Sequence, residues 1–173
     1  MQQRLQQLQA YTSAAEHFAA RLLGCPASAA DVCQASLEKA LTTVHYPSDP
    51  HVLKGWYFQV VRHQCMDQLR RRSHADLAEL EATDSAHSLI SDSGLNPDQQ
   101  LQRQQLANHM QRALNRLPLA HAEILWLREV HEFSYQQIAE IIDIEPGTVM
   151  SRIHRARLAL RTQLLTSIAL EDL

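Results

Sequence analysis

The sequence predicts an all-α protein built from two small helical domains. Only 4 of its 173 residues are Gly and 6 are Pro, while Ala, Leu and Gln are plentiful and β-branched residues are few. This composition favours helices over strands. Apolar side chains also recur three and four residues apart, as on a helix with one buried face. Barrels, sandwiches and large multi-layer enzyme cores are therefore excluded.

The chain has no feature that predicts secretion or membrane insertion. Its uncharged apolar stretches are shorter than the roughly 18 residues of a membrane span, and residues 1–9 form no apolar signal segment. We therefore expect a cytoplasmic protein without direct membrane insertion. Cys25, Cys33 and Cys65 are odd in number and form no Cys-x-x-Cys pair, which indicates free thiols rather than a disulfide framework or a zinc site.

The first two predicted helices cover residues 2–23 and 28–44. Gly24 and Pro26 end the first helix. Ser28 is the predicted N-cap of the second, since its hydroxyl can accept a hydrogen bond from a free backbone amide. The apolar positions of the first helix are Leu5, Leu8, Tyr11, Ala15, Phe18 and Leu22.

A loop and a third helix follow. Two prolines in residues 45–50 push the residue before each of them out of the helical region, so this stretch is a predicted loop. The third helix is expected over residues 51–72. Asp67 is predicted to pair with Arg70 or Arg71 on this helix. The predicted buried residues are Leu53, Trp56, Val60, Val61, Met66 and Leu69.

The remaining chain divides into a linker and a second helical domain. Residues 73–97 are rich in Ser, Asp and Ala and contain helix breakers, which indicates a flexible linker with at most a short turn at residues 76–80. Further helices are predicted after Pro97, with Leu101, Leu106, Met110 and Leu114 as apolar positions of the first. Their ranges are 98–117, 119–130, 134–142 and 147–165. The predicted domains are therefore residues 1–72 and 98–173.

The net charge of −3 hides an uneven distribution. Residues 74–100 carry six acids and no Lys or Arg, so the linker is acidic. Residues 54–72 carry five Lys or Arg against Asp67 alone, and residues 147–161 carry four Arg and no acid. Each basic patch is either a solvated face or a surface that binds a polyanion. Two such patches, each at the end of a helical pattern, favour the second interpretation.

The strongest motif lies in residues 133–161 and predicts a helix-turn-helix. Small or apolar residues stand where two crossing helices need them. Ser134 with Gln137 forms a predicted capping box, and Asp143 occupies a turn position that usually holds Gly but tolerates Asp. The apolar and small positions are Ile138, Ala139, Ile142, Ile144, Val149 and Ile153.

The outer face of the second of these helices is suited to DNA. Arginine can bind guanine or phosphate, and hydroxyl groups can bind phosphate or base edges. The free amides of a helix amino terminus also attract phosphate. The alternative is an ordinary solvated helical hairpin. The predicted major-groove residues are Thr148, Met150, Ser151, Arg152 and Arg155.

The same segment resembles a known family. Leu117-Pro118, Glu123-Ile124-Leu125, residues 133–141 and residues 146–157 are similar to region 4, the promoter-reading domain of the extracytoplasmic-function sigma factors. These are short sigma subunits of bacterial RNA polymerase. Residues 31–34 with Leu37 resemble region 2.2 of that family, and Trp56-Tyr57 through Arg72 resemble regions 2.3 and 2.4. The resemblance spans roughly residues 8–165.

This resemblance implies a role in transcription initiation. Region 4 would read the minus-35 promoter element, and region 2 would bind core RNA polymerase and melt the minus-10 element of promoter DNA. Asp31, Gln34 and Glu38, which share one helical face, would be the polymerase contact; the alternative is a solvated face. The implied minus-10 residues are Tyr46, Lys54, Arg62, His63, Arg70 and Arg71.

The resemblance also implies partners. An anti-sigma factor typically inhibits such a protein. The acidic linker would thread a basic channel of the polymerase, or it serves only as a soluble tether. Trp56 is expected in the core, although an exposed aromatic ring can also stack on a DNA base.

Two other classes of function fit the sequence less well. A stand-alone helix-turn-helix regulator would use residues 98–173 alone, but the segments at residues 31–37 and 56–72 argue against it. An enzyme is disfavoured because the ten histidines and three cysteines match no compact zinc template. Neither a nucleophile motif nor a Gly-rich phosphate loop is present. No cofactor or metal is therefore expected.

Overall fold

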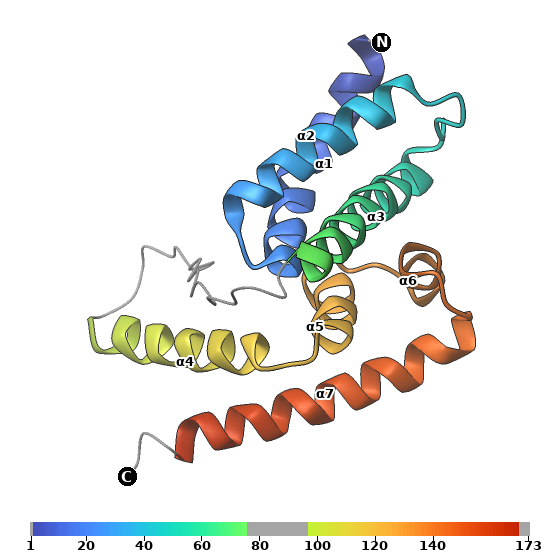
Figure 1. Cartoon of the computed structure of the whole chain (residues 1–173). Helices are drawn as coiled ribbons and strands as arrows, with labels where there is room; N and C mark the ends of the chain where they lie inside the picture. Colours follow the sequence, from blue (N-terminus) through green and yellow to red (C-terminus); the bar gives the residue numbers. More distant parts are fainter. Residues whose placement is uncertain (1, 76–96, 170–173) are drawn as a thin grey trace. The chain divides into compact units, whose positions relative to one another are not determined.

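The computed structural model describes residues 2–75 and 97–169, and every regular element in those ranges is helical (Figure 1). This confirms the predicted all-α class. The predicted linker lies mostly outside the described residues, as does its predicted turn, so the domain boundaries stay a prediction. The elements are α1 (Gln2–Leu23), α2 (Pro26–Thr42), α3 (Pro50–Ala75), α4 (Pro97–Asn115), α5 (Leu119–Leu125), the π-helical turn η1 (Trp126–Val130), α6 (Tyr135–Ile142) and α7 (Pro146–Ala169).

The described residues form two compact units. Unit 1 contains residues 2–75 together with Trp126–Val149, so η1, α6 and the first turn of α7 pack with the three amino-terminal helices. Unit 2 contains residues 97–125 and 150–169. Residues 126–149 therefore belong to the same unit as the amino-terminal helices, although residues 97–125, which precede them in the sequence, belong to the other unit.

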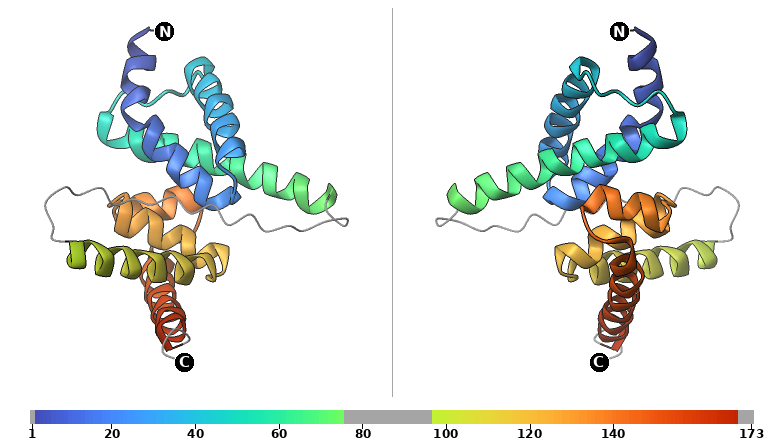
Figure 2. Two further views of the ribbon diagram at one scale, coloured as in Figure 1. Left: turned by 90° about the vertical axis from the view of Figure 1, so that its left-hand side faces the viewer. Right: turned by 90° about the vertical axis from the view of Figure 1, so that its right-hand side faces the viewer.

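Unit 1 is centred on α3. Helices α1 and α2 lie side by side and α3 packs against both, as Figures 1 and 2 show, while α6 packs on another side of α3. The residues that these helices bury include Leu8, Phe18, Leu22, Val32, Cys33, Leu53, Tyr57, Phe58, Val61 and Cys65. Burying such apolar side chains is the main favourable contribution to folding.

The start of α2 differs from the prediction. Gly24 has the left-handed φ of +65° that favours glycine and ends α1. Helix α2 then begins at Pro26 with Cys25 as its N-cap, not at Ser28. Proline suits the first helical position because the amide that it lacks would have no intrahelical partner there. The Ser28 hydroxyl instead accepts a hydrogen bond from Arg72 of α3.

The buried face of α3 also differs in part from the prediction. Leu53 and Val61 are buried as predicted, but Trp56, Val60, Met66 and Leu69 are only half-buried. Tyr57 and Phe58 are fully buried instead. The reason is that α3 is covered by α1 and α2 on one side and by α6 on another, which a single amphipathic stripe does not represent.

The predicted helix at residues 119–130 consists of two elements. Helix α5 ends at Leu125, and the chain continues in a π-helical turn with a hydrogen bond from His131 N to Trp126 O (3.1 Å). Such turns fit an extra residue into a helix. Trp126 and Leu127 are buried in it.

Unit 2 has a small core. The His109 Nδ1 atom of α4 lies 3.0 Å from the Ser167 hydroxyl of α7, and Ala113 is buried. Leu106 and Met110, predicted on the apolar face of α4, are 57% and 37% exposed.

Candidate nucleic-acid interface

Helices α6 and α7 form the predicted helix-turn-helix. The capping box is confirmed, because Gln137 N donates to Ser134 Oγ (3.2 Å) while Ser134 N donates to Gln137 Oε1 (3.0 Å). These two bonds satisfy amides that have no partner within a helix. The sequence thus specifies where α6 begins.

The turn between the two helices has the predicted backbone. Asp143 adopts the left-handed conformation, with φ 56° and ψ 60°, and Ile144 N donates to Ala139 O (3.0 Å). Ala139, Ile142 and Val149 are buried. Small and apolar residues therefore occupy the inside of the turn, and Asp replaces the usual Gly.

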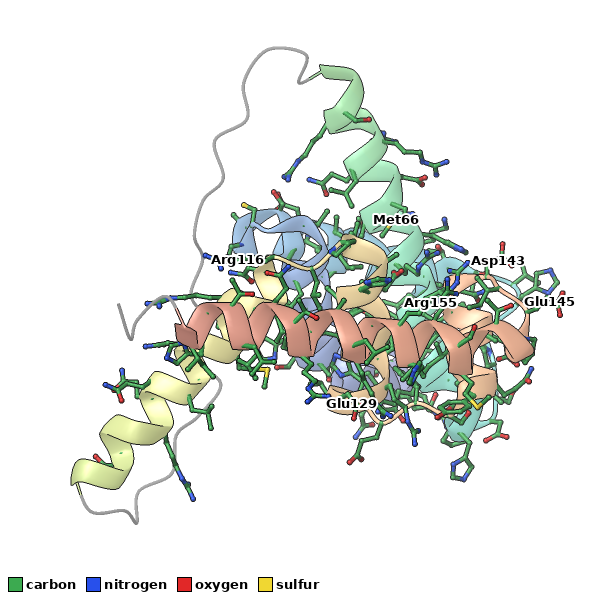
Figure 3. All side chains as sticks on the ribbon, turned by 90° about the horizontal axis from the view of Figure 1, so that it is seen from below. Met66, Arg116, Glu129, Asp143, Glu145 and Arg155 are labelled. Carbon is green, nitrogen blue, oxygen red and sulfur yellow. The ribbon has the colours of Figure 1, made fainter. Side chains whose placement is uncertain are left out.

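One face of α7 is open to solvent near its amino-terminal end. Met150 is 64% exposed, Ser151 and Arg155 are also exposed, and Thr148 and Arg152 are half-exposed. Arg155 Nε donates to Ser151 O one turn earlier (3.3 Å). Figure 3 shows Arg155 on α7, with Asp143 and Glu145 in the turn that precedes it. All five predicted minus-35 residues therefore lie on one helix that contains no acid.

The carboxyl-terminal half of α3 carries a second cationic surface. His63, Arg70 and Arg71 are exposed and Arg62 is half-buried. Arg70 pairs with Asp67, one of the two predicted pairings. An exposed ion pair of this kind contributes little to stability. These four residues lie along one helix, as their spacing in sequence predicted.

Lys54 has a different environment. Its ammonium group donates to the backbone carbonyl of His131 (2.8 Å) and lies 4.6 Å from the centre of the Phe133 ring. Two more bonds join the same elements, from Gln59 Nε2 to Glu140 O (2.7 Å) and from Gln137 Nε2 to His51 O (3.3 Å). In this arrangement Lys54 holds α3 to the segment before α6.

Tyr46, a predicted minus-10 residue, is packed against α1. Its hydroxyl donates to Gln7 Oε1 (3.1 Å), and the guanidinium of Arg4 lies 4.5 Å from the centre of its ring. The ring also meets Trp56 edge-on at 5.7 Å. Arg4 and Gln7 were not predicted as contact residues, although Arg4 is the only Lys or Arg before residue 21.

The predicted polymerase-contact residues form an exposed row on α2. Asp31, Gln34 and Glu38 are all exposed, and Gln34 Nε2 donates to Glu38 Oε1 (3.4 Å). The three residues therefore share one helical face, as their spacing predicted. This row lies in unit 1 and is accessible to a partner.

His131 lies in an aromatic cage, which the sequence analysis did not anticipate. Its ring centre is 4.8 Å from that of Phe58 and 6.0 Å from that of Phe18. Burial, followed by the charges of Lys54 and His17, lowers the pKa of His131 to about 4. Its Nε2 atom is buried without a hydrogen-bond partner. The ring is therefore neutral near pH 7 and acts as an apolar packing group.

The thiols differ in environment. Burial raises the pKa of Cys33 to about 12, whereas the hydrogen bond to the Ser28 side chain lowers the pKa of Cys25. The described ranges contain three free cysteines and no cluster of His, Cys, Asp and Glu arranged to hold a metal ion. No helix within them is both long and apolar enough to span a membrane.

These features define a class of protein. The described residues form an all-helical fold with a helix-turn-helix and two separate cationic surfaces, which is the pattern of a DNA-binding transcription protein. Comparison with known proteins specifies the family. Residues 8–75 match the model of sigma-70 region 2, and residues 108–160 match that of sigma-70 region 4.

Individual sigma factors are similar to this chain over most of its length. The chain is 28% identical over 149 residues to the ECF RNA polymerase sigma factor SigW of Bacillus subtilis, covering 83% of this chain and 79% of SigW. It is 28% identical over 134 residues to the ECF RNA polymerase sigma-E factor of Salmonella typhimurium, covering 75% and 70%. Its structure is similar to that of the sigma factor RpoE in complex with the anti-sigma factor NepR from Bartonella quintana, with a TM-score of 0.72, 26% identity and coverage of 92% and 94%.

The chain belongs to the extracytoplasmic-function sigma factors. It is an alternative sigma factor of transcription initiation.

The left-handed turn residue gives a stability prediction. Asp143→Gly should raise the free energy of unfolding by about 0.5–1 kcal/mol, because glycine adopts this conformation without steric cost, whereas Asp143→Val should lower it by about 1–2 kcal/mol. Urea unfolding followed by circular dichroism measures both changes. Glu132, which also has a positive φ of 57°, provides a parallel test through Glu132→Gly. Destabilisation by Asp143→Gly would contradict the conformation described.

The aromatic cage gives a pH prediction. Below pH 6.5 the unfolded chain protonates His131 while the folded chain does not, so the free energy of unfolding should fall by up to about 1.4 kcal/mol per pH unit down to about pH 4. His131→Phe, which cannot titrate, should reduce this slope in urea unfolding between pH 7 and pH 5. Gln6→Ala, at an exposed residue that does not titrate, is the control and should leave it unchanged. Equal slopes for the native chain and His131→Phe would refute the prediction.

Proposed function

We propose that this sigma factor recruits core RNA polymerase to promoters by reading the minus-35 element with α7 and opening the minus-10 element with α3 and the loop before it. The observation that carries the proposal is the capped helix-turn-helix with its exposed, acid-free helix, in a chain that matches both sigma regions. The protein would have no enzymatic activity of its own. The protein would act in the cytoplasm, where polymerase and DNA are found.

The minus-35 contact follows from the geometry of α7. The amino-terminal half of a recognition helix enters the major groove in helix-turn-helix proteins. Arg152 and Arg155 would bind guanine or phosphate, and Ser151 would bind phosphate or a base edge. The complete proposed set is Thr148, Met150, Ser151, Arg152 and Arg155.

The minus-10 contact requires a cationic groove for single-stranded DNA. His63, Arg70 and Arg71 are exposed in unit 1 and would supply polar and cationic side chains for such a groove. Lys54 would join them only after its bond to His131 is broken, because that bond now occupies its ammonium group. The complete proposed set is Tyr46, Lys54, Arg62, His63, Arg70 and Arg71. Within it Tyr46, which packs against α1, would support the loop rather than contact DNA directly.

The polymerase contact would be the exposed row on α2. Asp31, Gln34 and Glu38 would meet the clamp helices of the largest polymerase subunit, as region 2.2 does in this family. Two carboxylates in the row favour a basic partner surface. An anti-sigma factor that covers this surface would inhibit the protein. The solved relative RpoE was crystallised in complex with the anti-sigma factor NepR.

The proposed division of labour uses residues 1–72 and 98–173 as separate modules joined by residues 73–97. The two family matches, at residues 8–75 and 108–160, support this division. Reading two promoter elements at once requires the modules to separate, so the contacts that α6 makes with α3 would have to open on polymerase.

Initiation by reconstituted polymerase tests the proposal. Core polymerase with this protein should start transcription at defined sites in a genomic DNA library, whereas core alone should not. The protein alone should bind promoter DNA weakly, because it does not hold the two modules at a fixed separation. Equal products with and without the protein would refute the proposal, and tight duplex binding by the protein alone would favour a stand-alone regulator.

Substitution of the recognition arginines tests the minus-35 contact. Arg152→Ala or Arg155→Ala should weaken promoter recognition by about 1–3 kcal/mol if the side chain reads a base, and the loss should then depend on one base pair. Arg161→Ala, an exposed arginine further along α7, is the control. Competition binding of the holoenzyme to promoters with single base changes measures the effect. Losses no larger than that of Arg161→Ala would contradict the assignment.

A further inference from the structure

The segment of residues 43–49 joins α2 to α3 and has no regular structure of its own. It nevertheless makes specific contacts at three points: its start, its middle and its end. The start and the middle are both held by one side chain of α1, that of Arg4.

Arg4 binds the carboxyl-terminal end of α2. Its Nη1 atom donates to Thr43 O (3.1 Å) and Leu41 O (3.5 Å). The last carbonyls of a helix have no partner within the helix and carry a partial negative charge. A guanidinium is well suited to them, because it is planar, always charged and has several donors. Arg4 therefore fixes the point at which the chain leaves α2.

Arg4 also holds the middle of the segment. Its guanidinium covers the Tyr46 ring at 4.5 Å, within the range of a cation–π interaction. The Tyr46 hydroxyl donates to Gln7 Oε1 (3.1 Å), and Trp56 of α3 meets the ring edge-on. Tyr46 is thus enclosed by α1 and α3 and connects the segment to both.

The end of the segment is held by Asp49. Its carboxylate accepts a hydrogen bond from His51 N (2.8 Å), and its carbonyl accepts one from Leu53 N (2.9 Å). Asp49 therefore caps α3, which begins at Pro50.

Three side chains between these points face solvent. Val44 is 88% exposed, and His45 and Ser48 are exposed as well. An aliphatic side chain exposed to that degree on a segment held so closely is available for contact with a ligand, whereas Tyr46 is already engaged by α1.

We infer that Arg4 is a positioning residue for promoter opening: it fixes residues 43–49 so that Val44 and His45 meet a single-stranded base in a defined geometry, with Tyr46 as the internal support. This inference rests on the proposed function. A segment that is already ordered loses little conformational entropy when it binds, so its contacts translate more fully into affinity and base discrimination.

The test uses holoenzyme assembled from core polymerase and the full-length chain. The probes are short single-stranded oligonucleotides with the minus-10 sequence of a promoter found in the initiation experiment, and the same oligonucleotides with one base changed. The readout is the ratio of affinities for the original and changed bases. Arg4→Ala should lower this ratio about tenfold, equivalent to about 1.4 kcal/mol, and Arg4→Lys should recover part of it.

Two controls separate positioning from folding. Gln6→Ala, an exposed neighbour on α1, should leave the ratio unchanged. Tyr46→Phe keeps the ring but loses the hydroxyl, which bonds Gln7 Oε1 (3.1 Å) and the backbone carbonyl of Arg4 (3.4 Å). It should therefore lower the ratio by a smaller factor, and it serves as the decisive variant if Arg4→Ala fails to fold. A general loss of stability would weaken binding of both oligonucleotides equally and leave the ratio intact.

The outcomes are distinct. If the native holoenzyme initiates but the folded Arg4→Ala variant keeps its full discrimination, the inference is wrong while the proposed function stands. If Arg4→Ala does not fold and Tyr46→Phe discriminates as the native chain does, the inference is likewise wrong. If the native holoenzyme fails to initiate, the proposed function itself fails.

Discussion

Burial of the Phe58 ring is the interaction on which unit 1 depends. The ring centre lies 5.5 Å from that of Phe18 in α1 and 4.9 Å from that of Phe133 before α6, and the ring of His131 completes the cluster. Aromatic side chains bury large areas and favour such tilted contacts. Because one ring of α3 contacts partners from both ends of the chain, residues 126–149 belong to the same compact unit as α1–α3.

Several cations of unit 1 hold its elements together. Arg4, Lys54 and Arg72 each donate to backbone carbonyls of other elements and so stabilise the fold. Arg70 and Arg71, by contrast, are exposed on α3, where Arg70 pairs with Asp67 of the same helix. A basic residue in the sequence is therefore a poor indication of a DNA contact until its surroundings are known.

Two of these structural cations act at the carboxyl-terminal ends of helices, where a positive charge is favoured. Arg4 at the end of α2 and Arg72 at Leu23 O, the end of α1, are examples. The same helices then present their remaining surfaces, such as the row from Asp31 to Glu38, to solvent. The fold thus holds some polar side chains between its elements and leaves others, such as Asp31 and Glu38, exposed on the surface of unit 1.

The sequence by itself determined features that depend on neighbouring residues. The helical class, the extent of α1, the Ser134 capping box and the left-handed Asp143 were all predicted, because each follows from local backbone chemistry. Only the tertiary structure decided that the Ser28 hydroxyl bonds Arg72 of α3, that Tyr57 and Phe58 rather than Trp56 are fully buried, and that Lys54 and Tyr46 are already engaged. Those outcomes depend on partners dozens of residues away, and the period of a helix carries no record of which distant side chain will cover each face.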